Sequence, residues 1–280
     1  MIDKLFYLGP SGSYSEIAKN KFMNFCNKNT YFEASDSIYR IVENLKKNDS
    51  CTTCAVLPIE NSVEGIVKEV QDSLMDLTKF GYKILAETNI NINHSLVSFG
   101  EKEQIKTIIS HPQALAQCRK YINKLFGENI ILNPILSTSN AIKNLTPQDI
   151  TVAAIGSQHC ANMYNVPILD NCINDEKNNT TRFILLSQKE PVKSAFNKIS
   201  IVFSTENSSG ALNKILNILE QYQLNMSYID SRPSKRELGE YVFYVDFQGY
   251  LDDVNVKEAL DKIKLSTKMF KLLSDGAMLI

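Results

Sequence analysis

Neither sign of charge is in surplus in this sequence. Its 280 residues include 30 lysines and arginines and 31 aspartates and glutamates, which gives a formal net charge of −1 at pH 7. Attraction to nucleic acid or to an anionic membrane surface needs a basic patch or a net positive charge. We therefore expect neither as the main partner. With 44% hydrophobic and 22% charged residues, the chain has the composition of a globular protein and is long enough for two domains.

Long apolar runs are also missing. No stretch reaches the ~18–20 residues that a membrane helix needs. The first ten residues, Met1–Pro10, contain an early acidic residue and no basic segment before a longer apolar core, so they do not resemble a signal peptide. We therefore predict a cytoplasmic protein with no membrane contact.

Clusters of metal-ligating residues are scarce. Cys51 and Cys54 form a single Cys-x-x-Cys, with no second pair and no nearby histidine. A zinc or redox role is the alternative to a structural one. We favour the structural role because cysteines of a cytoplasmic chain are mostly reduced and often buried. No metal site is expected.

Short apolar runs alternate with segments of helical periodicity in the first part of the chain. Lys4–Leu8 and Ala55–Ile59 are predicted strands. Apolar residues at helical spacing predict helices over residues 38–45 and 63–74. This alternation of strands and helices predicts an α/β region.

Four further strands are predicted before residue 190. Ile90–Leu96 alternates apolar and polar side chains, which indicates a longer strand that leads from one lobe to another. The other three are the apolar runs Ile105–Ser110, Val152–Ile155 and Phe183–Ser187. Pro112 suits the first turn of a helix that follows Ser110.

The pattern pauses near residues 190–193, where we place a domain boundary. The remainder has the predicted order strand, helix, two strands, helix and strand, which is the βαββαβ order of a ferredoxin-like domain. These elements are Ile199–Ser204, Ala211–Tyr222, Met226–Ser231, Tyr241–Phe247, Val254–Ile263 and Met269–Leu273.

Four polar segments adjoin predicted strands in the first region, where open α/β sheets bind ligands. They are Gly9–Glu16, Pro58–Gly65, Ser110–Cys118 and Asn178–Phe183. Each also has a structural interpretation. The segment Gly9–Glu16 lacks the Gly-Lys-Ser/Thr ending of a P-loop. The spacing of Ser13 and Glu16 is that of a capping box, so this segment is either a capped helix start or a small anion site. In the second segment, Ser62 is suited to cap the N-terminus of a helix. In the third, His111 is suited to a structural hydrogen bond. The fourth, with Arg182, can be read as a polar loop that leads into a strand.

Taken together and in this order, the four segments resemble the prephenate dehydratase family. The family's Gly-Pro-x-Gly-Thr/Ser-aromatic-Ser turn matches Gly9–Ser15, and its Pro-Ile-Glu-Asn-Ser…Glu-Gly segment matches Pro58–Gly65. Its His-Pro-Gln-Ala-Leu stretch matches His111–Leu115, and its Asn-x-Thr-Arg-Phe signature matches Asn179–Phe183. The resemblance covers nearly the whole chain, and four motifs in register are specific.

The resemblance implies a fold of two α/β lobes with the site in the cleft between them, like a type II periplasmic binding protein. One lobe is expected to comprise residues 1–79 and 167–190, and the other residues 80–166. The strand at His94 and the chain near Val166–Asp170 are expected to cross between the lobes. A closing cleft would exclude water from the reaction.

The last region, residues 197–280, resembles the ACT regulatory domain. Gly210-Ala211-Leu212 matches its Gly-Ala-Leu turn, and Asp230-Ser231-Arg232-Pro233 matches its Glu-Ser-Arg-Pro segment, with Asn225 in the expected place before it. Asp230 replaces the family's glutamate, which keeps the charge and shortens the side chain by one methylene. These residues are the expected site for phenylalanine as feedback effector, between paired domains of a homodimer or homotetramer. A domain that only dimerises is the alternative.

The resemblance also implies the reaction, in which prephenate loses its ring carboxylate as CO2 and its ring hydroxyl as water to give phenylpyruvate. Aromatisation drives it, so no metal or redox cofactor is expected. Thr181 is the predicted donor to the leaving hydroxyl, and Phe183 is expected to pack near the ring. Arg182 is the predicted carboxylate ligand or, alternatively, forms a structural ion pair that orients the Thr181 loop. Further hydrogen bonds to substrate are expected from Ser13, Asn61, Ser62 and Asn179.

Other functions are compatible with parts of the sequence. A sister enzyme acting on arogenate, the transaminated analogue, has no distinguishing motif here. A non-catalytic sensor made of a two-lobed binding protein and an ACT domain is disfavoured, because a pure binder needs no leaving-group donor such as Thr181. An inactive scaffold is disfavoured by the polar turns at strand ends. No helical chorismate mutase segment precedes Gly9, so we expect the monofunctional form.

Overall fold

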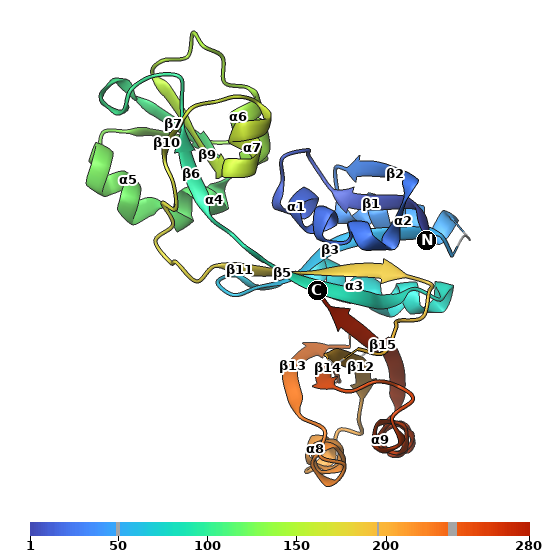
Figure 1. The fold of residues 1–280 in the computed structure, drawn as a ribbon. Coiled ribbons are helices and arrows are strands. Elements are labelled where there is room, and N and C mark those ends of the chain that lie inside the picture. Colours follow the sequence, from blue (N-terminus) through green and yellow to red (C-terminus); the bar gives the residue numbers. More distant parts are fainter. Residues whose placement is uncertain (49–50, 195, 235–239) are drawn as a thin grey trace.

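The chain folds into three lobes, which Figure 1 shows in the colours of the sequence. The structure, a computed structural model, describes residues 1–48, 51–194, 196–234 and 240–280. None of the helices in these ranges combines the length and the apolar character of a membrane span.

The first lobe is built from two separate parts of the sequence. It contains the strands β1 (Ile2–Leu8), β2 (Cys26–Ser35), β3 (Thr53–Asn61), β4 (Gly65–Ile66), β5 (Lys83–Asn91) and β11 (Thr180–Ser187), the helices α1 (Tyr14–Lys21), α2 (Ile38–Lys47) and α3 (Lys68–Leu77), and the 3-10 turns η1 (Met23–Phe25) and η2 (Thr78–Phe80). β11 lies between β5 and β3 and is antiparallel to both, while β1 and β2 continue the sheet beyond β3 in parallel. β11 therefore lies in the middle of this sheet although it comes last in the sequence.

The middle lobe has a sheet of its own. It contains the strands β6 (His94–Val97), β7 (Thr107–Ser110), β8 (Ile131–Pro134), β9 (Val152–Ser157) and β10 (Ile168–Asp170), the helices α4 (Pro112–Gln117), α5 (Arg119–Phe126), α6 (Thr138–Lys143) and α7 (Gln158–Met163), and the 3-10 turn η3 (Lys102–Gln104). The strand order is β10-β6-β9-β7-β8. Asn174 joins the two crossing segments, because its side chain donates to the Ile92 carbonyl (3.1 Å) and accepts from the His94 backbone N–H (2.6 Å).

The third lobe has the predicted βαββαβ order. Its elements are β12 (Asn197–Ser204), α8 (Ala211–Gln221), β13 (Met226–Pro233), β14 (Tyr241–Gln248), α9 (Val254–Leu265) and β15 (Met269–Leu279). One face of its sheet packs Ile201 and Phe247 against α8 and α9, and the other packs Val202 and Tyr244 into the core of the first lobe. The end of β15 also pairs in parallel with β5, so a single sheet extends through both lobes.

Three boundaries differ from the sequence-based prediction. The lobe boundary at residue 80 is too early, because Lys83–Asn91 pairs with β11 and belongs to the first lobe. The return crossing lies later than Val166–Asp170, because Ile168–Asp170 still pairs with β6. The helix expected over 63–74 begins only at Lys68, since Gly65 and Ile66 pair with β3, and Ser62 therefore does not cap it.

The turn between β1 and α1 touches the middle lobe at Gly12. Its φ is +83°, and a Cβ there would lie 2.7 Å from Cys160 Sγ. Gly12→Ala should lower the unfolding free energy by about 1–3 kcal/mol, because the left-handed backbone is strained and the contact with Cys160 is too close. Gly127→Ala is the matched control, because Gly127 has a φ of +71° and an added Cβ meets nothing within 4 Å. Chemical denaturation of both variants measures the difference, and equal losses would contradict a steric contribution from Cys160.

Candidate active site in the cleft between the first two lobes

A cavity of about 370 Å³ lies between the first and the middle lobe. The first lobe contributes the turn before α1 and the ends of β3 and β11, and the middle lobe contributes residues of α4 and the start of α6. Its volume is that of a pocket for a small molecule. The ends of strands and the starts of helices expose backbone N–H groups here, which suits a polar or anionic ligand.

Asn61 holds the hydroxyl of Thr181 in this cavity. Its Nδ2 donates to Thr181 Oγ1 (2.9 Å) and to Asn179 Oδ1 (2.7 Å). Its Oδ1 accepts from the backbone N–H groups of Val63 and Glu64, both at 2.9 Å, which fixes the orientation of the amide. Since the Thr181 oxygen already accepts a hydrogen bond, its own proton is free to point into the cleft.

A second amide, on the middle lobe, closes this network across the cleft. Gln117 Oε1 accepts from Asn179 Nδ2 (3.0 Å) and lies 3.2 Å from His94 Nε2. Gln117 Nε2 donates to Glu64 Oε1 in the first lobe (3.0 Å). The two lobes are therefore joined by neutral amides and one carboxylate directly beside Thr181.

Gln117, Glu64 and His94 were not predicted as site residues. Gln117 lies in the polar segment Ser110–Cys118, four residues after Gln113, so both face the same side of the helical segment. That spacing is the signal that sequence reasoning could have used. His94 is found only through the fold, because the strand that carries it crosses from one lobe to the other at this point.

His94 is a neutral member of the site. Burial of the ring lowers its pKa to about 4, and the hydrogen bond with Gln117 opposes this only partly. Its Nδ1 is buried and makes no hydrogen bond within the part of the chain that the structure describes. None of the described residues that line the cavity is a lysine or an arginine. The cleft therefore offers N–H and O–H donors rather than formal positive charge.

Five of the predicted site residues line this cavity together: Ser13, Asn61, Asn179, Thr181 and Phe183. Ser13 also caps α1 by accepting from the Glu16 backbone N–H (3.3 Å). Ser62 is not among the residues that line the cavity. Its hydroxyl donates to the Asn178 carbonyl (2.8 Å) and accepts from the Thr180 N–H (2.9 Å). Its role in this geometry is to tie the turn after β3 to the start of β11.

Arg182 does not lie with these residues. Successive side chains of a strand point to opposite faces, so Arg182 points away from the cleft that Thr181 and Phe183 line. Its guanidinium Nη1 donates to Asp246 Oδ2 of the third lobe at 2.7 Å, and its Nε lies 3.6 Å from Glu60 Oε2. The geometry does not fit the predicted carboxylate ligand of the substrate and fits the alternative, a structural ion pair beside Thr181.

The predicted effector residues lie at two places in the third lobe. Gly210, with a φ of +80°, precedes Ala211 and Leu212 at the start of α8. Asn225 precedes β13, and Asp230, Ser231, Arg232 and Pro233 form its end. β13 pairs only with β14, so its other edge is unpaired in the described residues. Arg232 points back to the first lobe, where it donates to Gln71 Oε1 (3.1 Å) and lies 3.5 Å from Asp72 Oδ1.

No group of three or more histidine, cysteine, aspartate or glutamate side chains suited to a metal ion occurs in the ranges described. The pair Cys51 and Cys54 consists of one exposed and one buried free thiol. Burial raises the pKa of the Cys54 thiol to about 11, so it is protonated at neutral pH. Protonated, a thiol is neither a ready metal ligand nor a nucleophile.

Comparison with known proteins assigns both regions to sequence families. The model of the prephenate dehydratase family matches residues 5–191, and the ACT domain model matches residues 199–265. A prephenate dehydratase of Methanocaldococcus jannaschii is 42% identical, over 92% of this chain and 91% of that protein. A chloroplastic arogenate dehydratase/prephenate dehydratase of Arabidopsis thaliana is 31% identical, over 96% of this chain and 71% of that protein. The crystal structure of Arthrobacter aurescens prephenate dehydratase in complex with L-Phe superposes with a TM-score of 0.83 at 29% identity, covering 97% of this chain and 88% of that one.

The neutral state of His94 predicts part of the acid sensitivity of the fold. Its folded pKa of about 4 lies below the ordinary value of 6.5, so its contribution to stability is complete above pH 6.5 and is lost as the pH falls towards 4. His94→Gln should therefore lose roughly 3 kcal/mol less unfolding free energy than the wild type between pH 7 and pH 4. Urea denaturation at the two pH values measures this, and an unchanged loss in the variant would contradict it.

Proposed function

The chain belongs to the prephenate dehydratase family, and we propose that it converts prephenate to phenylpyruvate, CO2 and water in the cleft described above. The observation that carries the proposal is the hydrogen bond from Asn61 to Thr181 Oγ1, at 2.9 Å, which leaves the hydroxyl proton free to face a ligand. A non-catalytic sensor needs no donor to a leaving group, and the prephenate dehydratase of Methanocaldococcus jannaschii is 42% identical to this chain. The enzyme interpretation is therefore favoured over the sensor and the scaffold.

Thr181 assists departure of the ring hydroxyl. As the bond to the ring carboxylate breaks, its electron pair passes into the ring, CO2 leaves, and the carbon–oxygen bond opposite breaks. The departing hydroxide, which keeps the electron pair of the carbon–oxygen bond, accepts the hydrogen bond of Thr181 and takes up one proton from solvent to leave as water. A hydroxyl is a weak acid, but aromatisation supplies most of the driving force, so a donated hydrogen bond in the right place suffices.

The absence of lysine and arginine among the described cleft residues suits the decarboxylation. A cation held against the leaving carboxylate would stabilise the ground state and raise the barrier. We place the side-chain carboxylate of prephenate instead at the turn before α1, where Ser13 and the backbone N–H groups of the helix start line the cavity. Phe183 is buried at the same cavity, beside the position of the ring. Asn179 connects Asn61, which donates to Thr181, with Gln117 of the middle lobe.

Regulation is assigned to the third lobe, an ACT domain. We propose that phenylalanine binds at Gly210, Ala211, Leu212, Asn225 and the segment Asp230–Pro233, between domains of two copies of the chain. The relative from Arthrobacter aurescens that was crystallised with L-Phe supports this effector. The unpaired edge of β13, with Met226 and Ile229 exposed, supports pairing in a homodimer or homotetramer. We also propose that the protein is located in the cytoplasm.

Removal of the Thr181 hydroxyl should abolish most of the activity. Thr181→Val keeps the shape and should lower kcat by about 10²–10⁴-fold, because the leaving hydroxide loses its donor. Thr181→Ser keeps the hydroxyl and is the control, with a loss of less than about tenfold. Steady-state kinetics with prephenate decide this, and near-normal turnover by the valine variant would end the assignment.

The substrate and the effector are tested in one assay. The purified protein should form phenylpyruvate from prephenate in the presence of a chelator, followed by ultraviolet absorbance, and phenylalanine should lower the rate. Arogenate should react more slowly, because its ammonium group would meet helix N-termini. Among the described residues that line the cavity, Glu64 is the only one with a carboxylate. Product from arogenate alone would indicate the sister enzyme. Product from neither substrate would favour the sensor, and a rate that phenylalanine leaves unchanged would contradict the regulation.

A further inference from the structure

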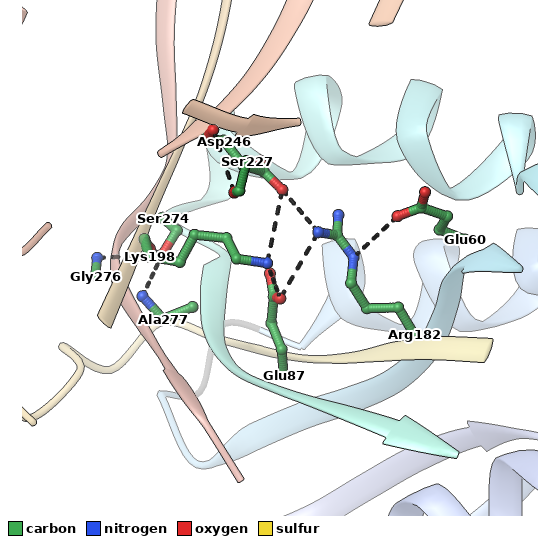
Figure 2. A network of polar contacts seen from close by, with 9 residues as sticks. All are labelled: Glu60, Glu87, Arg182, Lys198, Ser227, Asp246, Ser274, Gly276 and Ala277. Carbon is green, nitrogen blue, oxygen red and sulfur yellow. Dashed lines mark hydrogen bonds and ion pairs between the residues drawn. The ribbon is translucent and has the colours of Figure 1, made fainter. Parts of the chain in front are cut away.

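Four charged side chains form a closed ring at the boundary between the catalytic region and the ACT domain (Figure 2). Arg182 on β11 and Glu87 on β5 come from the catalytic region, and Lys198 on β12 and Asp246 on β14 come from the ACT domain. Each region therefore contributes one cation and one anion. The ring is neutral, and so is the pair that each region brings to it.

The contacts across the boundary are shorter than those within each region. Arg182 Nη1 lies 2.7 Å from Asp246 Oδ2, and Lys198 Nζ lies 2.7 Å from Glu87 Oε2. Within the regions, Arg182 Nη1 lies 3.8 Å from Glu87 Oε2, and Lys198 Nζ lies 3.9 Å from Asp246 Oδ2. Every member therefore has a second partner of opposite charge within 4 Å. The ring can pair across the boundary or within each region without leaving a charge alone.

That property matters because the ring is buried. The side chain of Glu87 is 1% exposed and that of Arg182 is 14% exposed. Separation of an ordinary buried ion pair leaves two uncompensated charges, which is strongly unfavourable. A ring of four, in which each region keeps a matched pair, lets the boundary shift without that penalty. Charge balance therefore permits two pairings of these four side chains, and two discrete arrangements are what a conformational switch needs.

One corner of the ring is adjacent to the residue that assists the reaction. Arg182 follows Thr181 directly, and the register between β11 and β3 shifts between Arg182 and Phe183. The extra residue of this irregularity is Ile59 of β3, whereas β11 pairs with β5 without a shift from Thr180 to Leu185, so Thr181 and Arg182 belong to one regular strand and move together. A movement of the guanidinium thereby reaches the Thr181 hydroxyl on the opposite face of the strand.

The other side of Arg182 contacts the proposed effector strand. The ring of Tyr228 lies 5.5 Å from the Arg182 guanidinium carbon, in a cation–π arrangement. Tyr228 is on β13, two residues before Asp230, where the proposed phenylalanine segment begins. β13 therefore contacts the charge ring directly, with no further element between them.

We propose that this ring is a clasp through which the ACT domain positions Thr181. Pairing across the boundary draws Arg182 towards Asp246 and holds the Thr181 end of β11 in its working position. Pairing within each region releases it. The regulatory part of this inference rests on the proposed phenylalanine effect. Asp246 and Lys198 are positioning residues, because neither touches the cleft.

The test compares single and paired removal of the ACT charges. Asp246→Asn and Lys198→Met should each lower the Tm and should lower kcat by at least about tenfold with KM within about twofold, because Thr181 is displaced while the substrate contacts remain. The double variant removes one cation and one anion from the ring. The two ring residues of the catalytic region, Arg182 and Glu87, then still compensate each other's charge. The double variant should recover most of the lost Tm but not the lost kcat.

Lys83→Met is the matched control. Lys83 forms an ion pair with Asp275 across the same boundary, four residues before Glu87 on β5 and outside the ring. Its loss also leaves one buried charge at the boundary without its cation, so the Tm should fall while kcat stays within about twofold of the wild type. The ratio of kcat/KM without and with phenylalanine should persist in this control and shrink at least about fivefold in the double variant.

Recovery of kcat together with Tm in the double variant would overturn the clasp, because the ring would then contribute stability alone. An equal loss of kcat in Lys83→Met would overturn it as well. The kcat comparison needs no phenylalanine. A wild-type enzyme that does not respond to phenylalanine would therefore refute the regulation proposed above, while kcat of the double variant would still decide on the positioning role.

Discussion

Strand β11 imposes the constraint on which both ends of the molecule depend. It is hydrogen-bonded on one side to β3 and on the other to β5, so each of its side chains must point to one face of the sheet or the other. Thr181 and Phe183 point into the cleft, and Arg182 between them points to the ACT domain. Three consecutive residues thereby line the cleft on one face and contact the ACT domain on the other. The cleft and the ACT domain are therefore connected through adjacent residues of one strand.

The same division separates the polar donors of the cleft from the positively charged side chains. The described lining of the cleft presents amides, hydroxyls and a histidine whose burial keeps it neutral, whereas Arg182 and Lys198 lie on the opposite face of the sheet with their carboxylate partners. A reaction that expels a carboxylate group is hindered by a cation that holds this group in place. Behind the sheet, the positive charge is compensated and out of reach of the substrate.

Local sequence signals predicted much of this arrangement. The apolar runs indicated most strands, the last region has the expected βαββαβ order, and the motif residues Asn61, Asn179 and Thr181 do meet in one cavity. Long-range pairing set the limit. Lys83–Asn91 was placed in the wrong lobe because its partner strand lies near the other end of the catalytic region. Gln117 was missed because a helix of the other lobe brings it to Thr181. Strand alternation alone would have turned Arg182 away from Thr181, but Asp246 as its partner follows only from the docking of the ACT domain.

The central place of β11 also governs the order in which the chain can fold during synthesis. β3 and β5 leave the ribosome early, but the strand that belongs between them follows only after the whole middle lobe has emerged. Until then the first lobe has two strands with unpaired edges, which are open to wrong partners. The middle lobe closes its sheet from one continuous stretch and can fold before its neighbour is complete. The part of the chain that is made first therefore finishes its own fold late, and the facing edges of β3 and β5 are covered only when β11 has been made.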